Sequence, residues 1–466
     1  MADTEQGRVV QVPESPPASG GLDRYFRIRE RGSTVRTEIV AGVTTWLTMA
    51  YILFVNPSIL GLDGAGLSFP QVLSVTALAA GVMTIAMGLV SNYPFALAAG
   101  LGLNAFVAFS LVVGNGLTFP QAMGVIVVEG LVITALVLTN LREMVMNAIP
   151  QDLKRAIGIG IGAFITLIGL VTGGVVTNEG PTPLAFGDLT SWPTGVFVVG
   201  LVVASVLVAR KVKGALLVSI LASTILAVIV NEATDGSYWA NGIAAVPSDV
   251  VATPDLGLIG EFSFGFFSVL GVAGAIAVIV TVGLSDFFDT MGTVIGLGGE
   301  AKLLDEQGRL PKAKKVLLVD SLAAVVGGVT SSSSNTTYIE SASGISEGGR
   351  TGLVAVVVGI LFLLSMFLSP IAGVIPPQAT GPVLVIVGYF MMTMARDIEW
   401  SDPGIGIPAL LTVFTMPFTY SITNGVGVGF LSYIVIAVAR GRARDIHPAL
   451  YIVGAIFVWY FVHGTI

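Results

Sequence analysis

The most informative stretch is GGVTSSSSNTTYIESASGISEGGR, which runs from Gly327 to Arg350. It is polar, rich in glycine and serine, and carries the acidic residue Glu340, yet apolar runs at 315–330 and 351–369 flank it and are long enough to cross a bilayer. Within a membrane, irregular backbone is tolerated only where it is buried in protein or lines a wet cavity. We therefore predict a binding site here, in which residues 336–339 form the first turn of a half-helix that carries Glu340. An ordinary loop outside the membrane is the alternative.

The composition is that of a polytopic membrane protein. Of the 466 residues, 54% are hydrophobic and only 11% are charged, and the mean hydropathy is +0.89, which is too apolar for a soluble globule of this size. Cysteine is absent, and His447 and His463 are the only imidazoles, so we expect no disulfides, no thiolate chemistry, no metal and no cofactor. The net charge of −7 comes without a basic stripe, which argues against a nucleic-acid partner.

Apolar runs of membrane-spanning length follow one another along the chain. Residues 1–22 are rich in proline and poor in large apolar residues, so we expect a disordered tail, and the arginines between Arg24 and Arg36 place it in the cytoplasm. Candidate spans lie near 37–57, 70–91, 94–113, 119–139, 152–175, 192–209 and 213–232, and, after a mixed segment at 233–262, near 265–290, 315–333, 334–347, 351–369, 380–395, 404–440 and 447–464. An odd number of spans in each half gives the two halves opposite orientations, as an inverted-repeat transporter requires.

The basic residues mostly agree with this arrangement, because cytoplasmic loops are enriched in lysine and arginine. Basic clusters follow even-numbered spans at 142–155, 210–213, 302–315, Arg350 and Arg396. The cluster at 440–444 would face outward if 404–440 crosses the membrane once. Pro417 and the glycines at 425–429 interrupt that run, so a hairpin that crosses twice is the alternative, with 447–464 as an additional span or an interfacial helix.

The third run, from Pro94 to Phe109, breaks its apolar pattern in a similar way. Gly100 and Gly102 allow close backbone approach, and Asn104 places one amide among apolar residues. A small-residue face for helix packing is the alternative. Paired interruptions in two halves point to the binding site of such transporters, so we pair this stretch with Gly327–Arg350.

Further carboxylates lie within apolar runs. Asp286 and Asp289, spaced i and i+3, share nearly one face of a helix. An unpaired carboxylate in lipid costs at least a few kcal/mol, so we expect both to face a cavity or each other, or to hold a proton. The alternative is that they end the span at the cytoplasmic interface. For Asp320 and Glu129, a structural hydrogen bond or ion pair is an equal alternative to a functional role.

Several motifs of the sequence resemble one transporter family. FFDTMGT at 287–293, LDEQGRLP at 304–311, TTYIESA at 336–342 and AGLGLNAF at 99–106 are similar to the AzgA-like purine permeases. That family carries adenine, guanine and hypoxanthine and belongs to the nucleobase-cation symporter and nucleobase-ascorbate group. The resemblance covers nearly the whole chain from about residue 24. It implies an all-helical fold of about 14 spans in two inverted repeats, with short strands in the broken third and tenth spans.

The resemblance also implies a core domain that slides as an elevator against a gate domain in the plasma membrane. The implied boundaries are 1–22 for the tail, 23–140 and 265–372 for the core domain, 141–233 and 373–466 for the gate domain, and 234–264 for an extracytoplasmic linker. By similarity, Asp289 and Glu340 occupy the positions of the acidic substrate-binding residues of uracil permeases, where both are glutamates.

Chemistry gives an independent reason for these acids. A purine base presents N–H donors, and an ionised carboxylate accepts two such bonds at once. We expect Glu340 to accept hydrogen bonds from the base and Asp289, with Asp286, to exchange the coupled proton, and the reverse assignment is equally open. Candidates to stack on the ring or to bond its heteroatoms are Phe106, Phe288, Tyr338, Asn104 and Thr337.

The expected function is therefore proton-coupled import of purine bases. An anion transporter of the same fold, such as a sulfate or bicarbonate carrier, is the alternative, but two acids in the pocket argue against an anion. A channel or an enzyme is a third hypothesis, although the serines at 331–334 have no histidine nearby in any span. The acids suit adenine, guanine, hypoxanthine and xanthine alike, proton coupling is favoured over sodium, and both a monomer and a homodimer fit.

Overall fold

The structure is a computed structural model that describes residues 20–61, 67–139, 149–177, 182–240, 242–247, 249–305 and 309–463. Three sequence predictions fall partly outside these residues: the disordered tail over 1–19, the loop motif over 306–308, and the basic residue Arg142. The side chain of Phe288 is also outside the description, although its backbone lies in a helix.

The described chain is helical, with two short pairs of strands. Up to residue 233 its elements are α1 (Gly21–Phe26), α2 (Val35–Met49), α3 (Ile52–Leu60), α4 (Phe69–Ser91), β1 (Leu97–Ala99), α5 (Leu101–Ala105), η1 (Phe106–Gly114), α6 (Phe119–Leu138), α8 (Gln151–Thr172), β2 (Val176–Thr177), β3 (Ala185–Phe186), α9 (Trp192–Ala209) and α10 (Ala215–Ala233). The remaining elements are α11 (Phe266–Glu300), α12 (Ala313–Val329), β4 (Asn335–Thr337), α13 (Ser341–Ser346), α14 (Gly352–Ser365), η2 (Met366–Leu368), α15 (Ser369–Gly373), α16 (Pro377–Met392), η3 (Thr393–Asp397), α17 (Pro403–Thr419), α18 (Ile422–Ala439), η4 (Ala443–Asp445) and α19 (Pro448–His463).

Within the described residues, 10 helices have the length and composition to cross a membrane, which confirms the polytopic prediction. Capping residues set where several of them begin. Thr118 and Gln121 form a reciprocal capping box at the start of α6. Ser191 caps α9 and Thr351 caps α14 through their side-chain oxygens. These polar residues satisfy backbone N–H groups that the apolar helices leave unpaired.

The run at 404–440 forms two helices that pack on each other, α17 and α18, so the hairpin alternative is the one that the structure supports. The break falls at Tyr420, which has φ +52° and ends α17, and Ser421 then accepts a hydrogen bond from Asn424 N and starts α18. Pro417, which suggested the interruption, lies inside α17. The helix α19 is an additional element beyond this hairpin.

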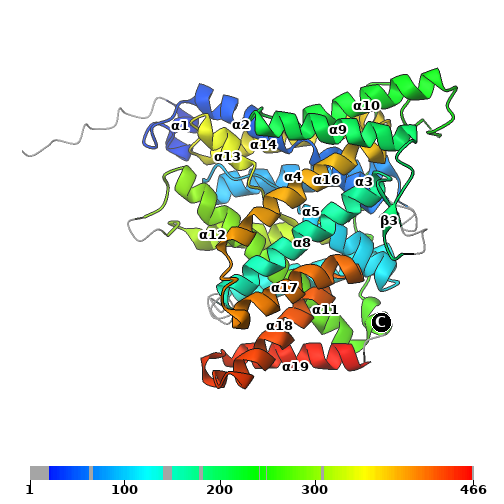
Figure 1. Cartoon of the computed structure of the whole chain (residues 1–466). Coiled ribbons are helices and arrows are strands. Elements are labelled where there is room, and N and C mark those ends of the chain that lie inside the picture. The colour runs from blue at the N-terminus through cyan, green and yellow to red at the C-terminus, as the bar shows by residue number, and fades with distance from the viewer. Residues whose placement is uncertain are drawn as a thin grey trace, which may run out of the picture.

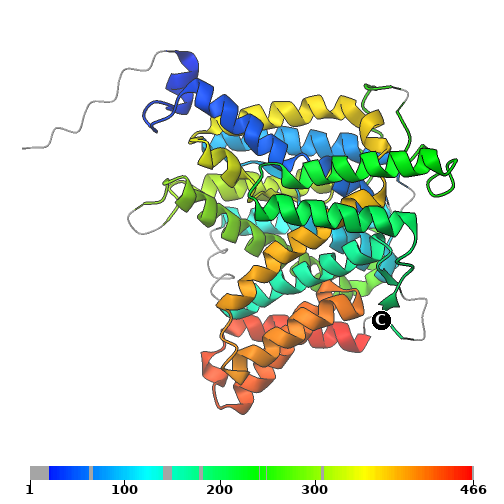
Figure 2. The same ribbon diagram turned by 45° about the horizontal axis from the view of Figure 1, so that its top comes forward.

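The long helices pack in two groups, and each group contains helices from the first half and from the second half of the sequence (Figure 1). In the first bundle, α14 packs on α4 and α2, and α12 packs on α6 and α4. The same bundle includes α11, which packs on α6, the strands β1 and β4, which pack on α4 and α12, and α13, which packs on α2. In the second bundle, α16 packs on α8 and α9, and α17 packs on α8 and α18. Figure 2 shows the same pairs from another side, with α14 beside α4 and α16 beside α8. Both groupings therefore join segments that are far apart in sequence.

Glycines permit the closest of these helix crossings. At the crossing of α4 with α14, a Cβ on Gly88 would lie 2.3 Å from the carbonyl oxygen of Gly352. At the crossing of α8 with α16, a Cβ on Gly169 would lie 2.8 Å from the carbonyl oxygen of Gly381. Small residues at helix crossings are the usual way in which apolar helices gain packing contacts in a membrane.

The two interrupted stretches meet as an antiparallel pair of strands. Leu97 lies opposite Thr337, Ala98 opposite Thr336, and Ala99 opposite Asn335. Each strand is followed by a short helix, α5 or α13, as the family resemblance implies. The prediction that 336–339 form a helical turn is wrong, because residues 335–337 pair with β1 and α13 begins at Ser341. Two β-branched threonines favour the extended conformation.

The serine run before β4 lies in the protein interior. Ser331, Ser332, Ser333 and Ser334 are each 0% exposed. Gly327, near the end of α12, must be a glycine, because a Cβ there would lie 1.9 Å from the carbonyl oxygen of Ser333. The serine run is therefore buried in protein, one of the settings in which irregular backbone is tolerated within a membrane.

Candidate functional site

A cavity of about 450 Å³ lies where the β1–β4 pair of the first bundle faces the second bundle. Its size falls within the roughly 300–1,000 Å³ that small-molecule sites occupy. The first-bundle wall consists of Tyr51, Gly100, Leu101, Gly102, Leu103, Ser285, Asp289, Gly292, Thr293, Thr337, Tyr338, Ile339 and Glu340. The facing wall consists of Lys154, Ile157, Gly158, Ile161, Val387, Phe390, Met391 and Met394.

Glu340 stands at the cavity between β4 and α13, where the strand ends and the short helix begins. It is half-buried, and the hydroxyl of Tyr51 donates a hydrogen bond of 2.6 Å to its Oε1 atom. This bond orients the carboxylate, whose second oxygen has its own lone pairs for a ligand donor. The prediction that Glu340 belongs to a binding site fits this placement.

Asp289 lies on α11 and its exposed side chain lines the same cavity. Asp286, one turn earlier, is 1% exposed and does not line the cavity within the described structure. The two acids that the i, i+3 spacing placed on one helix face therefore differ, because residues three apart are rotated by about 60° around a helix. Asp289 faces the cavity, whereas Asp286 faces the interior.

Asp320 is a buried anchor behind the cavity. It is 3% exposed, and its carboxylate accepts hydrogen bonds from the Thr337 N–H at 3.0 Å, the Thr337 hydroxyl at 2.7 Å and the Thr290 hydroxyl at 2.7 Å. The Thr290 hydroxyl also lies 2.8 Å from that of Thr336. Asp320 therefore ties α12, α11 and β4 together, so its role as a structural hydrogen-bond partner is the alternative that the structure supports.

The cavity side of β4 is also fixed by backbone contacts. Tyr338 is 6% exposed and lines the cavity, and its hydroxyl donates to the carbonyl oxygen of Ala99 at 2.5 Å. Its N–H donates to the carbonyl oxygen of Ala96 at 2.9 Å. The ring of Tyr338 is therefore held at the wall, whereas the Thr337 hydroxyl is already bonded to Asp320.

Two of the predicted contact residues lie behind the wall rather than on it. Asn104 is 0% exposed and Phe106 is 1% exposed, and neither lines the cavity in the described structure. Among the described residues, neither amide atom of Asn104 has a hydrogen-bond partner. Of the other predicted ring contacts, the side chain of Phe288 lies outside the description.

The facing wall was missed by reasoning from the sequence. Phe390, Met391 and Met394 lie at the end of α16 and in η3, and they supply an aromatic ring and two thioethers to the cavity. The signal in the sequence is the run YFMMTM at 389–394, in which large apolar and soft side chains gather at one end of a predicted span. Its position opposite β4 is a product of the tertiary fold.

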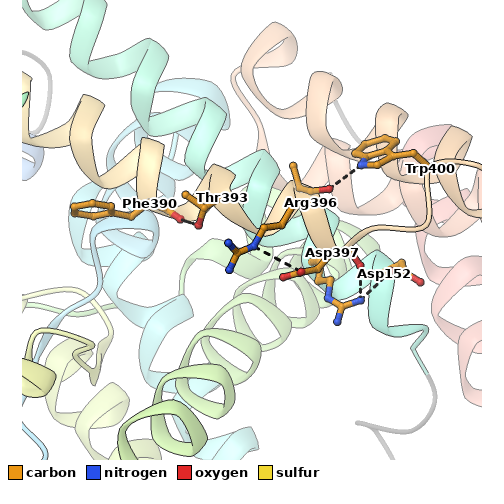
Figure 3. A network of polar contacts seen from close by, with 8 residues as sticks. Asp152, Phe390, Thr393, Arg396, Asp397 and Trp400 are labelled. Carbon is orange, nitrogen blue, oxygen red and sulfur yellow. Dashed lines mark hydrogen bonds and ion pairs between the residues drawn. The ribbon is translucent and has the colours of Figure 1, made fainter. Parts of the chain in front are cut away.

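A polar network holds the end of that wall in place (Figure 3). The Arg155 guanidinium donates to Asp152 Oδ1 at 3.0 Å and to the carbonyl oxygen of Asp397 at 2.8 Å. The Thr393 hydroxyl donates to the carbonyl oxygen of Phe390 at 2.7 Å. The bond from Arg155 to Asp397 fastens η3, which carries Met394, to the start of α8.

The chemistry of the cavity suits a small flat molecule that presents hydrogen-bond donors. Asp289 and Glu340 supply carboxylate acceptors on one wall. Tyr338, Phe390 and the methionines supply apolar surface for a ring. Among the described residues, no group of three or more acidic, histidine or cysteine side chains is placed to hold a metal ion.

The chain shares its fold with solved membrane transporters. It matches the transmembrane domain of a cyanobacterium bicarbonate transporter, BicA, with a TM-score of 0.58 and 16% identity, over 87% of this chain and 96% of that one. It matches murine solute carrier 26 family member A9, an anion transporter in the inward-facing state, with a TM-score of 0.61 and 9% identity, over 87% and 68% of the two chains. At these identities the likeness concerns the fold alone.

Sequence relatives are much closer. The chain is 41% identical over 440 residues to the adenine permease AdeP of Escherichia coli, which covers 94% of this chain and 95% of that one. It is 38% identical over 451 residues to the guanine/hypoxanthine permease PbuG of Bacillus subtilis, which covers 95% and 99%. Relatives named as purine permeases confirm the resemblance found in the motifs. Since residues 36–427 also match the Permease family, the chain belongs to that family and is a membrane transporter rather than an enzyme.

Proposed function

We propose that the chain imports purine nucleobases, namely adenine, guanine and hypoxanthine, by proton symport. The observation that carries this proposal is that two acids from separate parts of the chain, Asp289 and Glu340, line one cavity of suitable size. The names of the relatives support the same substrate class. A purine base is a flat ring with several N–H donors, so it matches a wall that carries two carboxylates and an opposite wall that is mostly apolar.

In the proposed complex, Glu340 accepts a hydrogen bond from the base through the oxygen that Tyr51 does not occupy. Asp289 accepts a second N–H of the base or exchanges the coupled proton, with Asp286 one turn away. Tyr338 and Phe390, from opposite walls, provide faces for the ring. An anion at this site would meet the negative charge of the two acids, so we place anion transport second.

We further propose that the first bundle is the core domain and the second bundle the gate domain of an elevator transporter. The chain is then built as two inverted repeats of about seven spans, with core segments at 23–140 and 265–372 and gate segments at 141–233 and 373–466. The strands β1 and β4 belong to the first bundle, and the cavity has a wall from each bundle. A rigid shift of the first bundle would therefore carry Asp289 and Glu340 past the second. The proposed setting is the plasma membrane, with the N-terminus in the cytoplasm.

The test is uptake of labelled adenine, guanine, hypoxanthine and uracil in cells that lack their own purine transporters, with and without a protonophore. We expect purine uptake by the parent to be abolished by the protonophore, and Asp289→Asn and Glu340→Gln to lose most of it at equal surface expression. Absence of purine uptake by the parent would contradict the function. Normal purine uptake by both variants would contradict the site while leaving the substrate class intact.

A further inference from the structure

Glu129 is a buried acid that lies outside the cavity and has no role in the proposed binding site. Glu129 on α6 is 0% exposed, and among the described residues neither of its carboxyl oxygens has a hydrogen-bond donor. Its side chain points at the backbone of α11, since a Cβ added to Gly283 would lie 3.7 Å from Glu129 Cγ and 3.9 Å from Oε1. The missing side chain of Gly283 therefore leaves the space in which the carboxyl group lies.

The charges around Glu129 are negative. From α12, Asp320 lies near enough for its charge to act on Glu129. From α11, Asp286 is buried and comes three residues after Gly283, about 60° from it around the helix. The third neighbour of α6, η1, has the sequence FVAFSLVVG and contains no titratable residue.

Basic side chains stand at the far end of this helix pair. Lys314 and Lys315 lie in the first turn of α12, where the Lys314 ammonium donates to the carbonyl oxygen of Leu138, the last residue of α6, at 3.4 Å. That carbonyl is about two and a half helical turns from Glu129. No basic residue of α11 comes between Phe266 and Glu300 in the sequence. Glu129 therefore has acids near it and the lysines far from it.

The hydrogen-bond donors around Asp320 and Glu129 favour different protonation states for the two acids. Asp320 accepts three hydrogen bonds, which stabilise its ionised form. An ionised Glu129 would be shielded from bulk solvent, without a donor among the described residues and near a second negative charge, which disfavours the ionised form. Protonation of Glu129 would remove this unfavourable charge, whereas Asp320 already has donors for its own.

The position of Glu129 relates this residue to the binding site. Asp320, which acts on Glu129, accepts hydrogen bonds from Thr290, the residue after Asp289, and from Thr337, which lines the cavity. Any change at the cavity that loosens these two donors changes the negative charge that Glu129 experiences. Glu129 is also carried by the first bundle, together with both cavity acids.

We propose that Glu129 is the site of the coupled proton, separate from the purine-binding acids. The carboxyl group loses its proton to water on the side where the purine is released, becomes a carboxylate, and takes up a proton again on the side where the purine binds. The purine itself keeps its protonation state throughout. This inference rests on the proposed proton symport, and it assigns the proton to a group that the sequence suggested only as a weak candidate.

The experiment uses the purified full chain in liposomes that contain a pH-sensitive dye. Adenine binding, adenine exchange across the membrane, and adenine-driven proton entry are measured for the parent and for Glu129→Gln, whose amide imitates a permanently protonated acid. We expect the variant to bind and exchange adenine within about twofold of the parent. Net proton entry and accumulation against a gradient should both be lost.

Glu38 provides a matched control. It is also 0% exposed, but its carboxylate accepts bonds from Arg350 N at 2.9 Å, from Thr351 N at 3.1 Å and from the Thr351 hydroxyl at 2.6 Å. Glu38→Gln should lower stability and leave the number of protons per adenine unchanged. The shorter acid in Glu129→Asp should keep proton entry and shift its pH profile, so it tests the proposal even if Glu129→Gln does not fold.

The outcomes separate the two proposals. Unchanged proton entry in Glu129→Gln, or a pH profile of Glu129→Asp that matches the parent, would overturn the role of Glu129 and return the proton to Asp289 or Glu340. Adenine transport by the parent without any proton entry, or driven by sodium, would overturn proton symport itself and Glu129 with it. Loss of proton entry with exchange intact would support both.

Discussion

The two interrupted stretches meet in one strand pair but contribute opposite things to the cavity. Leu97–Gly114 contains no charged residue, and it supplies Gly100, Leu101, Gly102 and Leu103 to the wall. Asn335–Ser346 is polar, supplies Glu340 and Tyr338, and is anchored from behind by Asp320. The first stretch gives the cavity wall backbone and apolar side chains, and the second gives it a carboxylate. The symmetry that the sequence suggested concerns backbone position and does not extend to chemistry.

The hydrogen bonding of buried side chains can also be compared between the two stretches. In the first, Asn104 has an amide without a partner among the described residues, just before η1, a π-helix in which Asn115 N bonds to the carbonyl oxygen of Ser110. In the second, the Thr337 hydroxyl and N–H are both satisfied by Asp320. Widened helical turns frequently mark functional sites, and an unsatisfied buried amide costs about 1–3 kcal/mol. Asn335 Oδ1, at the start of the second stretch, also lacks a partner among the described residues, so both stretches carry such a cost.

The largest expected effect concerns the charged stretch. Glu340→Gln removes a charged acceptor for the base, and hydrogen bonds to charged groups contribute about 1.5–3 kcal/mol, so purine transport should fall roughly tenfold to hundredfold. Initial uptake rates at equal surface expression measure this. The control is Glu347→Gln, a glutamate of the same region that pairs with Lys213 and does not line the cavity in the described structure. Equal losses in both variants would contradict the distinction between them.

The next effect concerns the first stretch. A Cβ added to Gly102 would lie 2.6 Å from Ile161 Cγ2 of α8, so Gly102→Ala overpacks the contact between the bundles at a cost of about 1–3 kcal/mol. Transport should fall about tenfold, and the double variant with Ile161→Val should recover most of it. Gly292→Ala is the control, because a Cβ there meets nothing within 4 Å in this cavity wall. If the double variant did not recover transport, the steric explanation would be contradicted.

A third effect separates stability from transport. Asn104→Leu removes an amide that has no partner among the described residues, so the unfolding free energy should rise by about 1–3 kcal/mol. Transport should fall if the amide finds a partner in another state of the cycle. Thermal unfolding in detergent and uptake in cells measure the two quantities. A loss of stability would show that the amide is satisfied in the state that predominates in solution.

The smallest effect on binding is expected at Thr337, whose hydroxyl the sequence suggested as a purine contact. Since that hydroxyl donates to Asp320, Thr337→Val should lower stability by about 1.5–3 kcal/mol. Purine affinity should change by no more than about twofold. Competition binding on purified protein measures this, with Thr293→Val on the same cavity wall as the matched variant. A large loss of affinity with unchanged stability would return Thr337 to the binding residues.

Much of the site was predictable because its residue types are expensive in a membrane. Asp289 was found as an acid in an apolar run and Glu340 as an acid in a polar break between two such runs, and both line the cavity. Asn104 was named as a lone amide in an apolar run and Phe106 as a ring to stack on the base, but both lie behind the wall, since a span does not show which way its residues face. Phe390 and Met394 carry no such cost in an apolar span, so nothing in the local sequence distinguished them.

What the sequence by itself determined is the membrane class, the approximate extent of most spans, and the two places where the helices break. These follow from hydropathy and from glycine, proline and polar residues, which act locally. The tertiary structure alone decided the pairing register of residues 335–337 with β1, the role of Asp320 as an anchor, and the position of Glu129 against Gly283 without a donor among the described residues. Each of those depends on contacts between segments distant in the chain, and the partner of a buried polar group is fixed only when those segments pack.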